Sequence, residues 1–265
     1  MPSANLFKSI SGSSEQKIQA IFHLLFDPSD DSIKSLNSVL LSDPSSIVRH
    51  EAAYILGEKS NSLAVPALIK AMTSDTAAIV VHESALALAN LGPIGYPESQ
   101  KILIDLLKKP DANIVDTAEI ALQRLEIKLK ENSISFNKSV LNEILLDKTP
   151  QNKEQRIQAS FLLMNDASTE SVELLIDSLH SEPSPIVRHE IIFSLGESIH
   201  YKVVPELINV LETDPNFFCV HESLLALGTI GDHSAERSIR KFLTHDNPEI
   251  VESAEIGLER LFSKS

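Results

Sequence analysis

Apolar residues recur along this chain in eight short segments that have helical spacing. In residues 46–58, Val48, Ala52, Ile55 and Leu56 fall within about 100° of one another at 100° per residue. The segments begin at Glu15, Ser46, Ala78, Asn113, Glu154, Pro185, Phe218 and Glu249. Each segment would form the apolar stripe of an amphipathic helix, which packs against the rest of the protein on that side.

The eight segments form two sets of four. The segment EQKIQAIFHLL recurs 139 residues later as EQRIQASFLLM, and VRHEAAYILGE recurs at the same distance as VRHEIIFSLGE. The last segments lie 136 apart, because residues 93–95 have no counterpart after Gly231. The chain is therefore an internal duplication with four units per half. Helix pairs with a period of about 32 to 35 residues stack into a solenoid, since one pair cannot bury its own stripe.

Short signals indicate where these helices begin and end. Asp43-Pro44 and Asp214-Pro215 would each place a capping carboxylate before a proline in the first turn. A helix can end in a left-handed glycine. We expect such ends at three glycines seven residues after a histidine, which are Gly57, Gly196 and Gly228.

These patterns predict an all-α fold of HEAT-like helical hairpins, arranged as two symmetrical four-repeat arches in a superhelical solenoid. The repeat pattern is also similar to the HEAT-like repeats of phycobilisome lyases. Residues 127–150 break the period. We expect an N-terminal HEAT-repeat half over residues 1–126, a linker over 127–150 and a C-terminal HEAT-repeat half over 151–265.

Charge and composition limit the classes of partner that this chain is expected to bind. The net charge of −14 repels phosphate backbones and anionic membranes and favours cationic partners, so we expect neither nucleic acid nor a membrane. The opening MPSANLFKSISGSSEQ has neither an apolar leader nor an Arg-rich transit pattern, and no apolar run is long enough to span a bilayer. The single cysteine, Cys219, falls at a buried helix position and excludes a disulfide framework. We predict a soluble protein of the cytoplasm.

Four of the nine histidines are followed by glutamate: His50-Glu51, His82-Glu83, His189-Glu190 and His221-Glu222. On the helical wheel His50 lies almost opposite the apolar stripe. We therefore expect the four imidazoles to project from one surface at equivalent positions of neighbouring repeats. The other five follow no pattern and are expected to be solvated: His23, His180, His200, His233 and His245.

Metal binding is one interpretation of the repeated pairs. Stacked helices lie about 8 to 10 Å apart and metal–imidazole bonds are about 2 Å long, so histidines of adjacent repeats can reach one ion. A neighbouring carboxylate would be a third ligand. Two histidines and one carboxylate are typical of non-haem Fe(II) that handles O₂. Folding one arch toward the other would bring two such sets together as a dinuclear centre.

The alternative is that a His-Glu pair at the start of a helix is ordinary surface, copied with the repeat. The first and fourth units lack the pair, and we align in its place Gln19-Ala20, Thr117-Ala118, Gln158-Ala159 and Ser253-Ala254. Copying alone does not explain that selectivity, so we favour metal binding. The chain shows no P-loop, GxSxG or CxxC motif that would indicate other chemistry.

The segments RHEAAYILGE and VHESALALANLG in the first half, with RHEIIFSLGE and VHESLLALGTIG in the second, resemble deoxyhypusine hydroxylase over nearly the whole chain. That family has HEAT repeats with four His-Glu motifs in two symmetrical halves. The resemblance implies a monooxygenase that uses a non-haem di-iron centre and O₂. Its substrate would be the deoxyhypusine side chain of translation initiation factor 5A, which becomes hypusine, and it would need an electron donor.

The resemblance also implies a role for each motif residue. One Fe(II) would be bound by His50, His82 and Glu83. The other would be bound by His189, His221 and Glu222. The remaining two glutamates, Glu51 and Glu190, would bind the substrate amines. Two alternatives stay open, a non-catalytic HEAT-like scaffold and a related di-iron oxygenase that acts on another amine.

Overall fold

A computed structural model describes residues 12–130, 134 and 136–263. Every regular element in these residues is helical, which confirms the predicted all-α class. The chain separates into two compact units, Met1–Asn132 and Ser133–Ser265. Residues 1–11, on which the expectation of no leader largely rests, lie outside the described residues. None of the helices described is long and apolar enough to cross a membrane.

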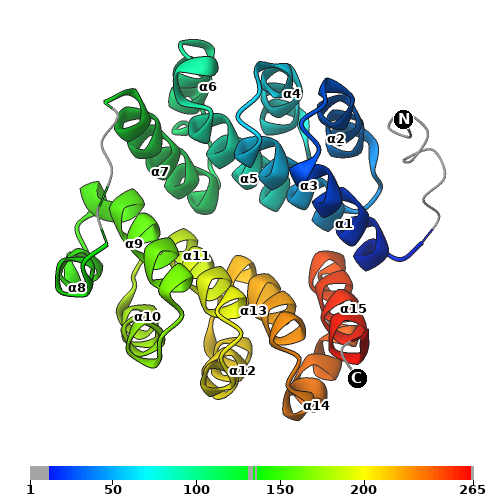
Figure 1. The fold of residues 1–265 in the computed structure, drawn as a ribbon. Coiled ribbons are helices and arrows are strands. Elements are labelled where there is room, and N and C mark those ends of the chain that lie inside the picture. Colours follow the sequence, from blue (N-terminus) through cyan, green and yellow to red (C-terminus); the bar gives the residue numbers. More distant parts are fainter. Residues whose placement is uncertain (1–11, 131–133, 135, 264–265) are drawn as a thin grey trace. The chain divides into compact units, whose positions relative to one another are not determined.

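The first unit has two rows of helices (Figure 1). In one row each helix packs against the next; its members are α1 Ser14–His23, α3 Ser46–Glu58, α5 Ala78–Asn90 and α7 Ala112–Leu129. The other row is α2 Asp30–Ser42, α4 Val65–Ser74 and α6 Glu98–Leu106. Helix α2 packs against α3, α4 against α5 and α6 against α7, so the odd-numbered helices carry the shared core.

The second unit repeats this plan. Its odd-numbered row is α9 Lys153–Asp166, α11 Pro185–Glu197, α13 Phe217–Ile230 and α15 Pro248–Ser263. The even-numbered row is α8 Lys138–Leu146, α10 Thr169–Ser181, α12 Val204–Thr213 and α14 Glu236–Arg240. The expected linker, 127–150, holds the end of α7 and all of α8. Because α8 packs against α9, it lies within the second unit.

Short 3₁₀ turns connect many of these helices. In the first unit they are η2 Leu24–Phe26, η3 Ser62–Ala64 and η4 Gly92–Ile94. In the second unit they are η5 Pro150–Asn152, η6 Tyr201–Val203, η7 His233–Ala235 and η8 Lys241–Thr244. Pro66 and Pro205 stand in the first turns of α4 and α12, where a missing N–H costs no helical hydrogen bond.

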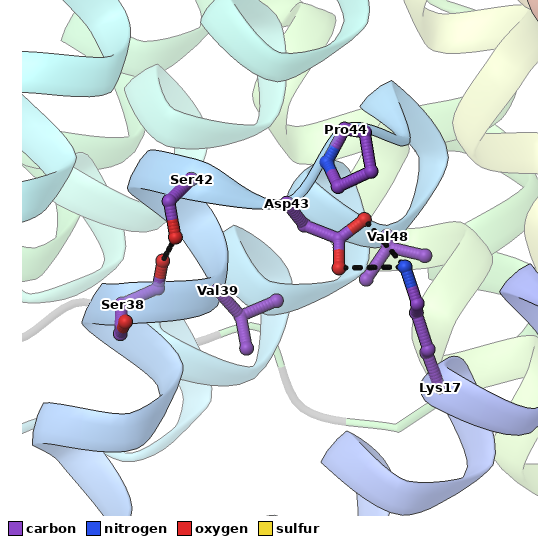
Figure 2. A pocket seen from close by; sticks show the side chains of 7 residues that line it. All are labelled: Lys17, Ser38, Val39, Ser42, Asp43, Pro44 and Val48. Atoms are coloured by element: carbon purple, nitrogen blue, oxygen red, sulfur yellow. Dashed lines mark hydrogen bonds and ion pairs between the residues drawn. The ribbon is translucent and has the colours of Figure 1, made fainter. Parts of the chain in front are cut away.

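An ion pair ties four of the odd-numbered helices to the next repeat. The basic residue is the fourth of its helix, and its acidic partner stands 26 residues later, before the next odd-numbered helix. Lys17 Nζ lies 3.0 Å from Asp43 Oδ2 (Figure 2). The other three pairs are each 2.8 Å long: Arg49–Asp75, Arg156–Glu182 and Arg188–Asp214. These pairs fix the register of successive repeats.

The predicted N-caps of α3 and α13 are wrong by two residues. The caps are Ser45, whose hydroxyl accepts the Val48 N–H at 3.0 Å, and Asn216. The Asp43 carboxylate instead accepts the Ser45 N–H and the Lys17 ammonium. An acid that binds the preceding repeat therefore lies outside the helix it was expected to cap.

The predicted helix ends are also wrong for three glycines, which lie inside α3, α11 and α13: Gly57, Gly196 and Gly228. A Cβ on Gly57 would lie 2.8 Å from Ala87 Cα, and one on Gly196 would lie 3.0 Å from Ala226 Cα. Glycine is therefore required by close helix packing. The left-handed residue that ends α13 is Gly231, with φ of 79°.

Candidate metal centre

The four histidines of the His-Glu pairs are buried. They are the fifth residues of α3, α5, α11 and α13, and between 0% and 6% of their surface is exposed. Four of the other five histidines are exposed and His200 is half-buried, as expected. The burial of the four paired histidines differs from the expected surface position, because the wheel of a single helix takes no account of what covers its polar side in the folded protein.

Each half brings a histidine of its second repeat against a glutamate of its third. His50 Nε2 lies 3.6 Å from Glu83 Oε2 between α3 and α5. His189 Nε2 lies 3.5 Å from Glu222 Oε2 between α11 and α13. Both carboxylates are at least nine-tenths buried. The two halves thus repeat one contact between the fifth residue of a helix and the sixth residue of the next.

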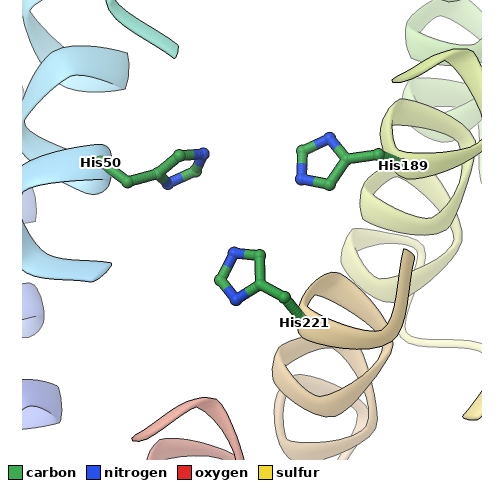
Figure 3. A group of neighbouring side chains, drawn as sticks. All are labelled: His50, His189 and His221. Atoms are coloured by element: carbon green, nitrogen blue, oxygen red, sulfur yellow. The ribbon is translucent and has the colours of Figure 1, made fainter. Parts of the chain in front are cut away.

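The second unit also places two imidazoles together. His189 and His221 project from α11 and α13 (Figure 3), with ring centroids 6.2 Å apart and planes 13° from parallel. In the first unit the corresponding residues of α3 and α5 are His50 and His82. The repeats therefore supply two imidazoles and one carboxylate from each half.

Electrostatics at α11 and α13 favour a cation beside the carboxylates. Burial opposes the charge on His189, but its contacts with Glu190 and Glu222 outweigh this and raise the pKa of His189 to about 10. Burial likewise works to raise the pKa of Glu222, yet the contact with His189 leaves that pKa below its usual value. A metal ion that binds here must replace the histidine proton as the counter-charge.

Hydroxyl groups contact the other two histidines. His82 Nδ1 lies 2.9 Å from Thr117 Oγ1 of α7, and His221 Nδ1 lies 2.7 Å from Ser253 Oγ of α15. Both hydroxyl residues are fully buried. Sequence reasoning missed these two residues. The available signal was a hydroxyl at the same place in the fourth unit of each half.

The structure corrects the alignment of these fourth units. Thr117 is the sixth residue of α7 and Ser253 the sixth of α15, so they correspond to Glu83 and Glu222. The sequence alignment placed them at the histidine position of the pair and is therefore wrong by one residue. The same shift applies to the first units, where Gln19 and Gln158 are the sixth residues of α1 and α9.

The glutamates assigned to substrate, Glu51 and Glu190, are the sixth residues of α3 and α11. Glu51 is half-buried. Glu190 is 6% exposed, and its Oε1 lies 3.5 Å from Nδ1 of His189. Their roles, and those of the six assigned metal ligands, stay predictions.

The donor set fits a ferrous ion. An N–O separation of 3.5 Å allows Nε2 and Oε2 to lie about 2.1 Å from one ion. Two imidazoles and one carboxylate form the ligand set of non-haem Fe(II) sites that keep positions open for O₂. Burial of all these side chains would keep such an ion from bulk water.

Comparison with known proteins identifies the family of this chain. HEAT repeats match residues 33–123 and 172–259. Deoxyhypusine hydroxylase of Schizosaccharomyces pombe is 31% identical over 246 residues, which cover 83% of this chain and 76% of that protein. The same enzyme of Danio rerio is 30% identical over 266 residues, covering 92% and 86%. The structure of human deoxyhypusine hydroxylase is 25% identical, covers 94% of this chain and 97% of its own, and superposes with a TM-score of 0.72. This chain belongs to the deoxyhypusine hydroxylase family of HEAT-repeat proteins.

Proposed function

We propose that this protein hydroxylates the deoxyhypusine side chain of translation initiation factor 5A, using O₂, two Fe(II) ions and an external electron donor. The observation that carries the proposal is the buried histidine–glutamate contact, which recurs at one helix position in both halves. The relatives that match most of the chain are hydroxylases, which supports an enzyme over a non-catalytic scaffold.

Each half would bind one ion. The ligands proposed are His50, His82 and Glu83 in the first half, and His189, His221 and Glu222 in the second. When bound, ferrous iron would activate O₂ so that one oxygen atom enters a C–H bond of the substrate. That the two ions form one dinuclear centre stays a prediction from the sequence.

The side chains would prepare the site before O₂ arrives. Burial of the ligands excludes water, so a reactive oxidant would meet the substrate and not solvent. The lowered pKa of Glu222 keeps its carboxylate ionised at neutral pH, as a metal ligand must be.

Substrate binding would fall to Glu51 and Glu190. The deoxyhypusine side chain is a cationic polyamine arm, and carboxylates pair strongly with ammonium groups. Holding the amines fixes the position of the carbon to be hydroxylated. The net charge of −14 would draw a cationic substrate toward the protein. We place this reaction in the cytoplasm, as the sequence predicts. A related polyamine remains the second candidate substrate, because the same carboxylates would also bind it.

The test supplies the iron-loaded protein with O₂, a reductant and a protein that carries deoxyhypusine. Mass spectrometry of the modified lysine should show the gain of one oxygen atom. Glu51→Gln and Glu190→Gln should retain iron but lose turnover, while Glu255→Gln, an exposed residue of α15, should keep both. Loss of iron from the first two variants would make those glutamates ligands. A fully iron-loaded protein that leaves deoxyhypusine unchanged but hydroxylates a free polyamine would favour the second substrate.

A further inference from the structure

The fourth repeat of each half lacks a His-Glu pair, yet it contacts the histidine of the third repeat. Thr117 of α7 and Ser253 of α15 occupy the helix position that holds Glu83 and Glu222 one repeat earlier. In all four cases the sixth residue of one helix meets the histidine of the helix before it. The position is therefore used in every interface between the second, third and fourth repeats.

The atoms that meet differ between the two interfaces. A carboxylate of the third repeat lies against Nε2 of the histidine before it, as in His189 with Glu222. A hydroxyl of the fourth repeat lies against Nδ1, as in His221 with Ser253. Between repeats two and three, Nε2 of the histidine therefore faces a glutamate that is itself a proposed metal ligand. Between repeats three and four, a hydroxyl contacts the opposite ring nitrogen, Nδ1.

Hydrogen bonding at Ser253 determines which nitrogen of His221 carries the proton. The Ser253 hydroxyl donates its one hydrogen to the Glu249 carbonyl at 2.6 Å. Its oxygen can then only accept from His221 Nδ1 at 2.7 Å, so Nδ1 is the protonated nitrogen. In the neutral ring the lone pair therefore lies on Nε2, which is the nitrogen that would bind a metal.

A hydroxyl suits this place better than a second carboxylate. It holds the ring by accepting one hydrogen bond, and it adds no charge to a buried site that already contains Glu190 and Glu222. Metal-binding histidines commonly donate the other N–H to such an outer partner, which fixes the tautomer and the ring orientation. In the first half His82 Nδ1 meets the Thr117 hydroxyl at the equivalent helix position, 2.9 Å away.

We infer that Thr117 and Ser253 are positioning residues, which hold His82 and His221 as the Nδ1–H tautomer and direct Nε2 toward the metal. The inference rests on the proposed function, since it concerns the ligands of the same two ions. Neither residue touches iron or substrate in this account. Each acts through its histidine.

The tautomer can be measured without metal. The ¹⁵N shifts of imidazole in the metal-free protein, recorded where the rings are neutral, should place the proton of His82 and His221 on Nδ1. Ser253→Ala should turn His221 into a mixture of tautomers and leave His82 unchanged, and Thr117→Val should do the reverse. Ser253→Thr and Thr117→Ser keep the hydroxyl and should restore the original shifts.

Anaerobic titration with Fe(II) gives a second readout. Wild-type protein should bind two ions, and each variant without the hydroxyl should weaken one of them by about 10- to 100-fold while the other is unchanged. Ser194→Ala is the matched control, because Ser194 is equally buried and also donates to the carbonyl four residues before it. It should change neither ion.

The outcomes separate the two claims. If wild type binds two ions but Ser253→Ala changes neither the His221 shifts nor the affinity, the inference is overturned and the proposed function stands. A wild-type proton on Nε2 of His221 would also overturn the inference. If wild type binds no iron, the proposed function fails and the metal role of both hydroxyls fails with it.

Discussion

The two halves keep the candidate ligands at the same separation but support them differently. The histidine–glutamate distance is 3.6 Å in the first half and 3.5 Å in the second. The first ion pair of each half is not so alike. Lys17 and Asp43 keep 19% and 13% of their side chains exposed, whereas Arg156 and Glu182 are completely buried. The ion pair can therefore vary without moving the ligands.

What the halves share is the close approach of the helices that carry the ligands. Gly57 packs on Ala87 between α3 and α5, and Gly196 packs on Ala226 between α11 and α13. These contacts lie one to two turns beyond the ligands on the same pairs of helices. The comparison indicates that helix register and small-residue packing set the ligand distance in both halves.

Arg156→Ala should give the largest difference in stability from the equivalent substitution in the other half. It leaves Glu182 buried with Lys148 at 3.3 Å and the Ser184 N–H at 3.0 Å as its partners. Removing one partner of a buried ion pair costs about 3 kcal/mol or more of unfolding free energy. Lys17→Ala removes the equivalent, partly exposed pair and should cost about 1 kcal/mol or less. Urea denaturation of both variants measures the difference. Equal losses would show that burial of the pair does not matter.

Gly196→Ala should show what the two halves have in common, because each half depends on a glycine contact of this kind. A Cβ here would lie 3.0 Å from Ala226 Cα, and forcing the helices apart costs about 1 to 3 kcal/mol. Gly57→Ala should lose a similar amount. The control is Gly95→Ala, whose Cβ would meet its nearest neighbour, Leu88 Cδ1, at 3.4 Å. Thermal denaturation would contradict this account if Gly95→Ala were the most damaging of the three.

Much of the fold and of the candidate site could be predicted from the sequence, because both follow from repeated segments. The 139-residue duplication and the helical apolar stripe predicted the all-α repeats, and the four His-Glu pairs identified the candidate ligands. The burial of His50 and His189 could not be predicted from one helix at a time, since it depends on the rest of the folded chain. A pattern within one helix does not record what packs across it.

Errors of register have a similar origin. The fourth-repeat helices contain no histidine at the fifth position, so sequence alignment had no fixed point and placed Thr117 and Ser253 one residue too early. Asp43 was assigned to the cap of its own helix, although Lys17 of the preceding repeat and the Ser45 N–H use its carboxylate. Contacts between repeats decide both cases.

Cys219 marks a second difference between the halves, since Val80 occupies the corresponding position. Its substitution is expected to have the smallest effect on stability. The thiol is fully buried, and burial raises the pKa of Cys219 to about 12, so the reactive thiolate is scarce at pH 8. A thiol reagent should label the folded protein hardly at all and the denatured protein fully. Rapid labelling of the folded protein would show that α13 opens. Cys219→Val should change stability by less than about 1.5 kcal/mol.

The most direct test of the central claim counts iron in each half separately. Metal analysis of protein loaded anaerobically with Fe(II) should find two ions per chain in wild type and in His233→Ala, which changes an exposed histidine. His50→Ala and His221→Ala should each retain one ion, and the double variant should retain none. Two ions bound by the double variant, or none by wild type, would contradict the account.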